Sequence, residues 1–252
     1  MTAQDKLIIL FIHGAWHIPL HYRDLLDRLR SGGYGILAPT LAITGYDDSI
    51  DGKTHVDATA QVRQLLIPYL DQGRKVVVVS HSYGGAVATQ VSAGLTLEER
   101  VAQGLRGGVV GLVYIAAIIS PEDGRAPPER PFPYPAGWTD YKKLPLPHDL
   151  ARALLYHDVE EPRVNEALRL LVWQSESAST PDGLCVVSDI PVPKTYVVCK
   201  NDKIVMPKDQ YRFAEAAGAT VVELECGHSP FLIEKETAAL VDIITKTATA
   251  LK

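Results

Sequence analysis

The sequence lacks the features that mark secreted, membrane-spanning or zinc-stabilised proteins. Only three cysteines occur among 252 residues, and their odd number without CxxC spacing argues against a disulfide framework and a structural zinc site. We expect Cys185, Cys199 and Cys226 to be free, half-buried thiols. No apolar stretch approaches the roughly 20 residues that span a bilayer, and no signal-peptide pattern precedes the first apolar run. We therefore expect a cytoplasmic protein.

The sequence also lacks the clustered positive charge typical of proteins that bind nucleic acid or anionic membranes. The net charge is −5 and no block of Lys or Arg stands out, so the chain carries no electrostatic footprint for nucleic acid or for an anionic membrane. Hydrophobic residues make up 46% and charged residues 22% of the sequence, which is the composition of an ordinary globular protein. The length fits one α/β domain better than two small ones.

Short β-branched runs alternate with segments of helical periodicity. The runs cover residues 7–12, 35–38, 75–80, 109–119, 195–200 and 220–224. Residues 76–79 are four consecutive valines, and a strand without polar alternation is buried on both faces. Apolar residues repeat with a 3.6-residue period after several of these runs, for example at Tyr22, Leu25, Leu26 and Leu29. This order predicts an α/β fold with a mostly parallel sheet of about six strands flanked by helices.

Residues 121–189 interrupt the alternation. Eight of the 17 prolines lie between positions 121 and 147, with Phe132, Tyr134, Trp138 and Tyr141 among them, so this stretch is expected to be neither sheet nor continuous helix. Helices are predicted around 149–156 and 162–173. We interpret 121–189 as a helical, proline-rich cap inserted into a core of residues 1–120 and 190–252. The alternative is a disordered linker, which the aromatic residues and low charge disfavour.

The candidate nucleophile is Ser82. It follows the buried valine strand within Ser80-His81-Ser82-Tyr83-Gly84 and precedes a helix of small residues, which is the setting of a nucleophile elbow. A serine hydroxyl needs a base to take its proton, and the sharp turn exposes the hydroxyl to that base. Ser80 replaces the first glycine of G-x-S-x-G. The alternative is a Gly/Ser-rich turn that only begins a helix.

His228 is the candidate base and Asp202 the candidate acid. His228 lies in a turn just after the run 220–224, and Asp202 follows the run 195–200. A carboxylate would hold the imidazole in the tautomer that accepts the serine proton. His228 could instead be structural, and Asp202 could form an Asx turn or pair with Lys203. Two rival acids follow the run 109–119, Glu122 and Asp123.

The loop after the first strand, His13-Gly14-Ala15-Trp16-His17, is the candidate oxyanion loop. The hole should combine the backbone N–H of Ala15 with that of Tyr83. Histidines near an elbow commonly serve as hydrogen-bonding neighbours, and no ligand cluster for a metal can be assembled. We expect no metal and no cofactor. The residues predicted to contact substrate are His13, Gly14, Trp16, His81, Trp138 and Trp173.

Four motifs resemble the α/β-hydrolase superfamily: F-I-H-G-A-W-H at 11–17, S-H-S-Y-G-G at 80–85, N-D-K at 201–203 and G-H-S-P-F at 227–231. The chain is most similar to the branch of plant methylesterases, hydroxynitrile lyases and small microbial or fungal esterase-like proteins. This resemblance implies a six-stranded core, a triad of Ser82, Asp202 and His228, and an oxyanion hole at Ala15 and Tyr83. Hydroxynitrile lyases of this branch have lysine directly after the catalytic histidine, and Ser229 stands there.

The motifs predict a serine hydrolase that cleaves a small-to-medium, apolar ester or lactone through an acyl-enzyme on Ser82. The apolar preference follows from the aromatic residues of the proposed cap, which could equally serve only to pack it. One alternative keeps the triad but catalyses a biosynthetic reaction, such as ring closure, ring opening or C–C cleavage. Another is a non-catalytic ligand-binding protein, which would have no need of all three triad residues.

Overall fold

The computed structural model describes residues 7–119, 142–178 and 185–251. Its main feature is a six-stranded sheet in the order β2-β1-β4-β5-β8-β9, in which every neighbouring pair is parallel. The strands of this sheet are β1 (Ile8–Ile12), β2 (Gly35–Leu37), β4 (Lys75–His81), β5 (Gly108–Ile115), β8 (Lys194–Cys199) and β9 (Thr220–Leu224). The predicted α/β fold is confirmed.

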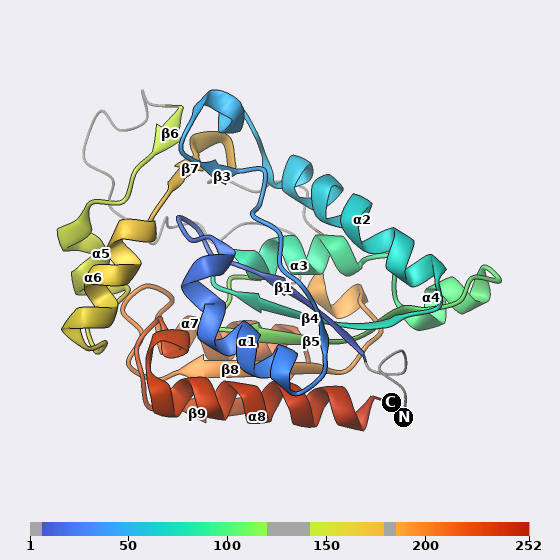
Figure 1. Ribbon diagram of the computed structural model, residues 1–252. Coiled ribbons are helices and arrows are strands. Elements are labelled where there is room, and N and C mark those ends of the chain that lie inside the picture. Colours follow the sequence, from blue (N-terminus) through green and yellow to red (C-terminus); the bar gives the residue numbers. More distant parts are fainter. Residues whose placement is uncertain (1–6, 120–141, 179–184, 252) are drawn as a thin grey trace.

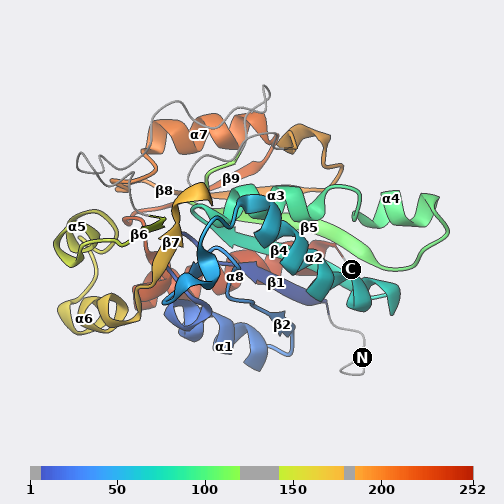
Figure 2. The same cartoon turned by 90° about the horizontal axis from the view of Figure 1, so that it is seen from above.

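Helices cover both faces of the sheet. On one face α1 (Arg23–Ser31) lies beside α8 (Glu234–Ala250), and on the other α2 (His55–Asp71) lies beside α3 (Gly84–Ser92) (Figure 1, Figure 2). The short α4 (Leu97–Ala102) precedes β5, and α7 (Pro207–Ala216) packs against β8 and β9. Among the helices of the described residues, none combines the length and apolar character needed to cross a membrane.

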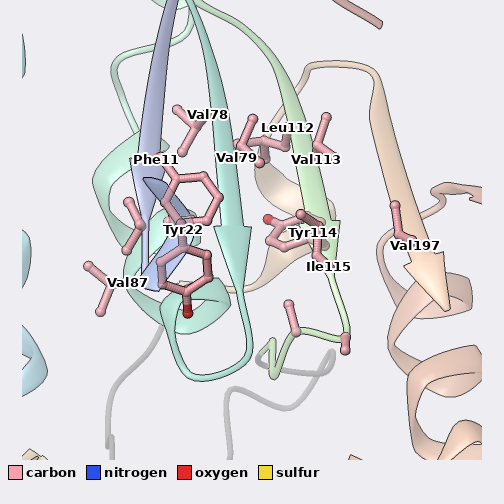
Figure 3. Packing of buried hydrophobic residues seen from close by; sticks show 14 of the residues in the cluster. Phe11, Tyr22, Val78, Val79, Val87, Leu112, Val113, Tyr114, Ile115 and Val197 are labelled. Carbon is pink, nitrogen blue, oxygen red and sulfur yellow. The ribbon is translucent and has the colours of Figure 1, made fainter. Parts of the chain in front are cut away.

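The sheet is buried because its central strands are apolar on both faces. All four valines at 76–79 are fully buried, as the missing alternation predicts. Val79 lies between Phe11 of β1 and Val113 of β5 in the register of the sheet, and Figure 3 shows these side chains packed around the central strands. A sheet covered on both sides leaves the loops at its carboxyl edge as the natural place for a site.

Residues 142–178 form a second, smaller layer beyond the carboxyl edge of the sheet (Figure 1). It contains two helices and a three-stranded sheet of order β3-β7-β6. Residues 142–178 supply β6 (Lys143–Leu144), α5 (His148–Leu154), α6 (Glu161–Leu170) and β7 (Trp173–Ser175), and the core segment Thr44–Gly45 adds β3 to the sheet. β6 lies within 121–147 and pairs with β7, which corrects the expectation that this stretch contains no sheet.

The structure corrects three expectations, on the end of a helix, the end of a strand and the burial of two thiols. The helix expected around 162–173 ends at Leu170, where Leu171 turns to extended backbone, and the Val172 N–H donates to the carbonyl of Trp16. The strand expected over 109–119 ends at Ile115, where Ala116 adopts a φ of 42°. The thiols of Cys199 and Cys226 are buried and not half-buried: Cys199 is the last residue of β8, and Cys226 lies two residues beyond β9.

Candidate active site

The turn between β4 and α3 holds Ser82 in a strained conformation. Its φ is 53°, a left-handed value that costs a non-glycine residue on the order of 1 kcal/mol or more. The surrounding backbone maintains it: the Ser82 N–H donates to Ile115 O at 3.1 Å, and the Ser82 carbonyl accepts from Gly85 and Ile118 at 3.0 and 2.9 Å. This strand, strained serine and helix have the form of a nucleophile elbow.

Glycine is required where the elbow meets the end of β1. A Cβ on Gly84 would lie 2.4 Å from the Ile12 carbonyl oxygen, and one on Gly14 would lie 3.0 Å from Ser82 Cβ. The loop after β1 therefore touches the candidate nucleophile directly. Ser80, which replaces the first glycine of the motif, is fully buried in β4, and its hydroxyl has no hydrogen-bond partner among the described residues.

His228 and Asp202 form a buried hydrogen-bonded pair. Asp202 lies three residues beyond β8 and His228 four residues beyond β9, so the parallel sheet delivers both to the same edge. His228 Nδ1 donates to Asp202 Oδ2 at 2.7 Å, and the two side chains are 1% and 0% exposed. Asp202 is therefore placed to orient His228, as proposed from the sequence, and among the ion pairs of the described residues none joins Asp202 to Lys203.

The other oxygen of Asp202 is held by backbone. Asp202 Oδ1 accepts the N–H groups of Ile204 and Val205 at 2.7 and 3.1 Å, so the residue also forms the Asx-type turn that was its alternative interpretation. Gln210 Nε2 donates to Oδ2 at 3.1 Å. The two interpretations are compatible because the carboxylate has one oxygen for the turn and one for the imidazole.

Among the hydrogen bonds of the described residues, none joins the Ser82 hydroxyl to His228. His228 is nevertheless next to the elbow, because its ring lies 4.6 Å from the ring of His81, the residue before Ser82. Hydrogen bonds between nucleophile and base are often long in sites without substrate and shorten when substrate binds.

The two amides predicted for the oxyanion hole have no protein acceptor within the described part of the chain. Neither the Ala15 N–H nor the Tyr83 N–H enters a hydrogen bond there, although both follow strands that end beside Ser82. Buried backbone donors are nearly always paired. These two amides, which have no acceptor among the described residues, are therefore well suited to a developing oxyanion.

The histidines of the oxyanion loop are committed to internal hydrogen bonds. His13 Nδ1 donates to Gly14 O at 2.9 Å, while Nε2 accepts the Leu41 N–H at 3.0 Å. His17 Nδ1 donates to Ala15 O at 2.8 Å, and its Nε2 accepts from the Tyr156 hydroxyl at 2.9 Å. Burial lowers the pKa of His13 to about 4 and the pKa of His17 well below its usual value.

Both ring nitrogens of His13 and of His17 are hydrogen-bonded within the protein, and these neutral rings hold the loop in shape. Neither nitrogen of His13 is therefore available to a substrate. No group of three or more His, Cys, Asp or Glu side chains arranged for a metal ion occurs in residues 7–119, 142–178 and 185–251.

The remaining predicted residues lie in or near the second layer. Trp16 Nε1 donates to Leu144 O at 3.0 Å, which ties the oxyanion loop to β6. Trp173 begins β7, is 39% exposed, and has the Lys143 ammonium 5.2 Å from its ring centroid. Trp138 and the rival acids Glu122 and Asp123 lie outside the described residues, as do the other aromatic residues expected in the cap.

Sequence reasoning missed three polar residues that support the candidate site. Tyr22 donates to His81 Nδ1 at 2.8 Å, Gln210 supports Asp202, and Asp158 accepts the N–H of Gly227, which precedes His228. Tyr22 was interpreted only as part of an apolar helix face. A buried tyrosine hydroxyl needs a partner, so that signal was present in the sequence, but the identity of the partner was not.

Comparison with known proteins assigns the chain to a family. The model of the alpha/beta hydrolase family matches residues 9–243, so the chain belongs to the α/β-hydrolase family, and the predicted membership is confirmed. An "Alpha/beta hydrolase nvfD" from Aspergillus novofumigatus is 28% identical over 234 residues, covering 90% of this chain and 91% of that protein.

Two further relatives are esterases by name. A carbendazim hydrolyzing esterase from Nocardioides sp. is 34% identical over 116 residues, covering 46% of this chain and 43% of that protein. The solved structure of a methylesterase from Arabidopsis superposes with a TM-score of 0.71 at 19% identity, covering 97% of this chain and 100% of that one. At that identity the structural likeness shows the shared fold. Together these findings place the chain among the α/β hydrolases.

Proposed function

We propose that this hydrolase is a serine esterase that cleaves a small-to-medium, apolar carboxylic ester or lactone through an acyl-enzyme on Ser82. The observation that carries the proposal is the buried 2.7 Å hydrogen bond between His228 Nδ1 and Asp202 Oδ2, beside a serine with a φ of 53°. Family membership and the esterase relatives support the reaction class. A histidine ordered by a carboxylate next to a strained serine is the arrangement that nucleophilic acyl transfer needs.

In the acylation step, Ser82 Oγ attacks the carbonyl carbon while its proton passes to Nε2 of His228. Asp202 stabilises the imidazolium, since its Oδ2 already accepts the Nδ1 proton. The N–H groups of Ala15 and Tyr83 stabilise the tetrahedral oxyanion, and each donor of this kind typically contributes about 10²–10³ in rate. Collapse of the intermediate breaks the C–O bond, and the leaving alkoxide takes the proton back from His228.

Deacylation repeats the sequence with water in place of Ser82. His228 removes a proton from the water, the hydroxide attacks the acyl carbon, and Ser82 leaves as the protonated hydroxyl. For a lactone the alcohol stays attached to the acyl group, so the product is a single hydroxy acid. The apolar substrate preference rests on the aromatic residues at 132–141 of the proposed cap and on general pocket chemistry.

The test combines a fluorophosphonate probe, which labels activated serines, with turnover of p-nitrophenyl acetate. We expect the probe to label Ser82 and both signals to disappear in Ser82→Ala. Ser80→Ala is the matched control, because Ser80 is buried two residues away and its hydroxyl has no partner among the described residues. It should keep labelling and turnover close to wild type.

Each other outcome identifies an alternative. Labelling at Ser82 without turnover of any short ester would favour a biosynthetic enzyme that uses the same three residues as an acid–base device. Absence of both labelling and turnover in the folded wild-type protein would contradict the esterase proposal and favour a ligand-binding protein.

A further inference from the structure

A chain of three hydrogen bonds links the oxyanion loop to the candidate base. The Gly14 N–H donates to the Tyr22 hydroxyl at 3.1 Å, that hydroxyl contacts His81 Nδ1 at 2.8 Å, and His81 Nε2 lies 2.8 Å from the His228 carbonyl oxygen. All four residues are buried. In Figure 3 the Tyr22 hydroxyl points away from Phe11 and toward the loops at the carboxyl edge.

The partners determine the direction of each bond. The His228 carbonyl can only accept, so His81 carries its proton on Nε2. Nδ1 is then an acceptor for the Tyr22 O–H, and the Tyr22 oxygen accepts from Gly14. Burial lowers the pKa of His81 well below its usual value and raises that of Tyr22, so both groups are neutral and each donates one hydrogen bond along the chain.

The chain spans the proposed catalytic machinery on both sides of Ser82. Gly14 precedes Ala15, whose N–H is one proposed oxyanion donor, and His81 precedes Ser82 itself. A Cβ at Gly14 would lie 3.0 Å from both His81 Nδ1 and Ser82 Cβ. The oxyanion loop is therefore in direct contact with the elbow and with His81 of the hydrogen-bond chain. At its other end, the hydrogen-bond chain contacts the backbone carbonyl of His228, whose side chain is the candidate base.

We propose that Tyr22 and His81 are positioning residues for the esterase reaction, because their hydrogen bonds fix the oxyanion loop at Gly14 and the base loop at His228 relative to Ser82. This inference rests on the proposed function. Neither side chain needs to touch the substrate. They act on two backbone segments that must keep their spacing while the tetrahedral intermediate forms, and a misplacement of about 1 Å can cost on the order of 10² in rate.

A purely structural role makes a different prediction. The ring of Phe231 lies 4.1 Å from that of Tyr22 and 5.0 Å from that of His81, so both residues also belong to a packed aromatic cluster. If packing were their whole contribution, Tyr22→Phe would keep the ring and keep the rate. The decisive change therefore removes only the hydroxyl.

The experiment compares Tyr22→Phe with Tyr114→Phe. Tyr114 is the matched control because it is fully buried in β5 and its hydroxyl bonds Thr89 Oγ1 at 2.9 Å, away from Gly14 and His228. Active sites are counted with the fluorophosphonate probe, so that kcat for p-nitrophenyl acetate refers to reactive enzyme alone. We expect Tyr22→Phe to lower kcat about tenfold or more, with KM and melting temperature close to those of Tyr114→Phe.

Substitutions at His81 test the same hydrogen-bond chain from the end that contacts His228. His81→Gln can place an N–H near the former Nε2 and keep the bond to the His228 carbonyl, whereas His81→Leu keeps neither bond. We expect His81→Gln to recover part of the kcat lost in His81→Leu. The double variant Tyr22→Phe/His81→Leu should lose less activity than the two single losses combined, because the two residues share the hydrogen bond between them.

Equal per-site kcat values in Tyr22→Phe and Tyr114→Phe, with a wild-type enzyme that turns over the ester, would overturn the positioning role and leave the esterase proposal intact. Additive losses in the double variant would also overturn it, because they would mean that Tyr22 and His81 act independently. A wild-type protein without labelling or turnover would refute the proposed function, and this inference with it.

Discussion

Acidification from pH 7 to pH 5 should destabilise the folded protein through its buried histidines. Desolvation lowers the pKa of His13 and of His21 from the ordinary value of 6.5 to about 4. In the unfolded chain these residues bind a proton near pH 6.5. Between pH 6.5 and 4 the unfolded state therefore holds more protons, and the free energy of unfolding falls as the pH falls. The penalty is absent above about pH 6.5 and grows as the pH falls toward 4.

Proton linkage gives the size of the effect. With pKa values of 6.5 unfolded and about 4 folded, each of the two histidines costs about 2 kcal/mol at pH 5 relative to pH 7. Two such groups give about 4 kcal/mol, and His17 and His81, whose pKa values burial lowers even further, act in the same direction. A loss of this size is a large part of the ~5–15 kcal/mol that stabilises a typical domain.

The assay is urea unfolding at pH 7, 6 and 5, with the free energy of unfolding extrapolated to water at each pH. His21→Gln should reduce the pH dependence by close to one proton, because His21 bonds the Ile18 and Ala167 backbone as a neutral ring. His148→Gln is the control, since His148 is exposed at the start of α5. A free energy of unfolding that stays constant from pH 7 to pH 5 would refute the claim that these buried rings are neutral.

Two further predictions concern the acid and the elbow. Asp202→Asn should lower kcat by about 10⁴, as the analogous change does in serine proteases, with p-nitrophenyl acetate as substrate; near-full activity in that variant, together with loss in a Glu122 or Asp123 variant, would reassign the acid. Gly84→Ala should cost about 3 kcal/mol or prevent folding, because its Cβ would lie 2.4 Å from a carbonyl oxygen. Gly35→Ala, whose Cβ would meet only a flexible Ile8 atom at 3.3 Å, should change stability by less than about 1 kcal/mol, as thermal denaturation can check.

The core of the fold was predictable because local pattern and tertiary environment agree there. The valines at 76–79 have no polar alternation, and the structure buries them on both faces of a parallel sheet. Residues 142–178 were less predictable. There, the short strand Lys143–Leu144 is defined by its pairing with β7, and beyond the end of α6 at Leu170 the Val172 N–H donates to the distant Trp16 carbonyl. Contacts between distant segments leave no local periodicity.

The candidate site divides in the same way. Ser82, Asp202 and His228 could be proposed from sequence because each follows a strand, and parallel strands carry their successors to one edge. The residues that connect them could not, since Tyr22 and Gln210 lie on helices whose apolar patterns describe packing alone. Their roles depend on the position of one hydroxyl and one amide in three dimensions.

Backbone strain is concentrated at the same edge. Within the described residues, the non-glycine residues with left-handed φ values are Trp16, Ser82 and Ala116, and they follow β1, β4 and β5, three adjacent strands of the sheet. Each such conformation costs on the order of 1–3 kcal/mol, and the neutral histidines nearby add a cost that grows with acidity. The apolar sheet offsets both. Because the strain lies where the proposed nucleophile and oxyanion donors must be held, relieving it should stabilise the fold while weakening the reaction.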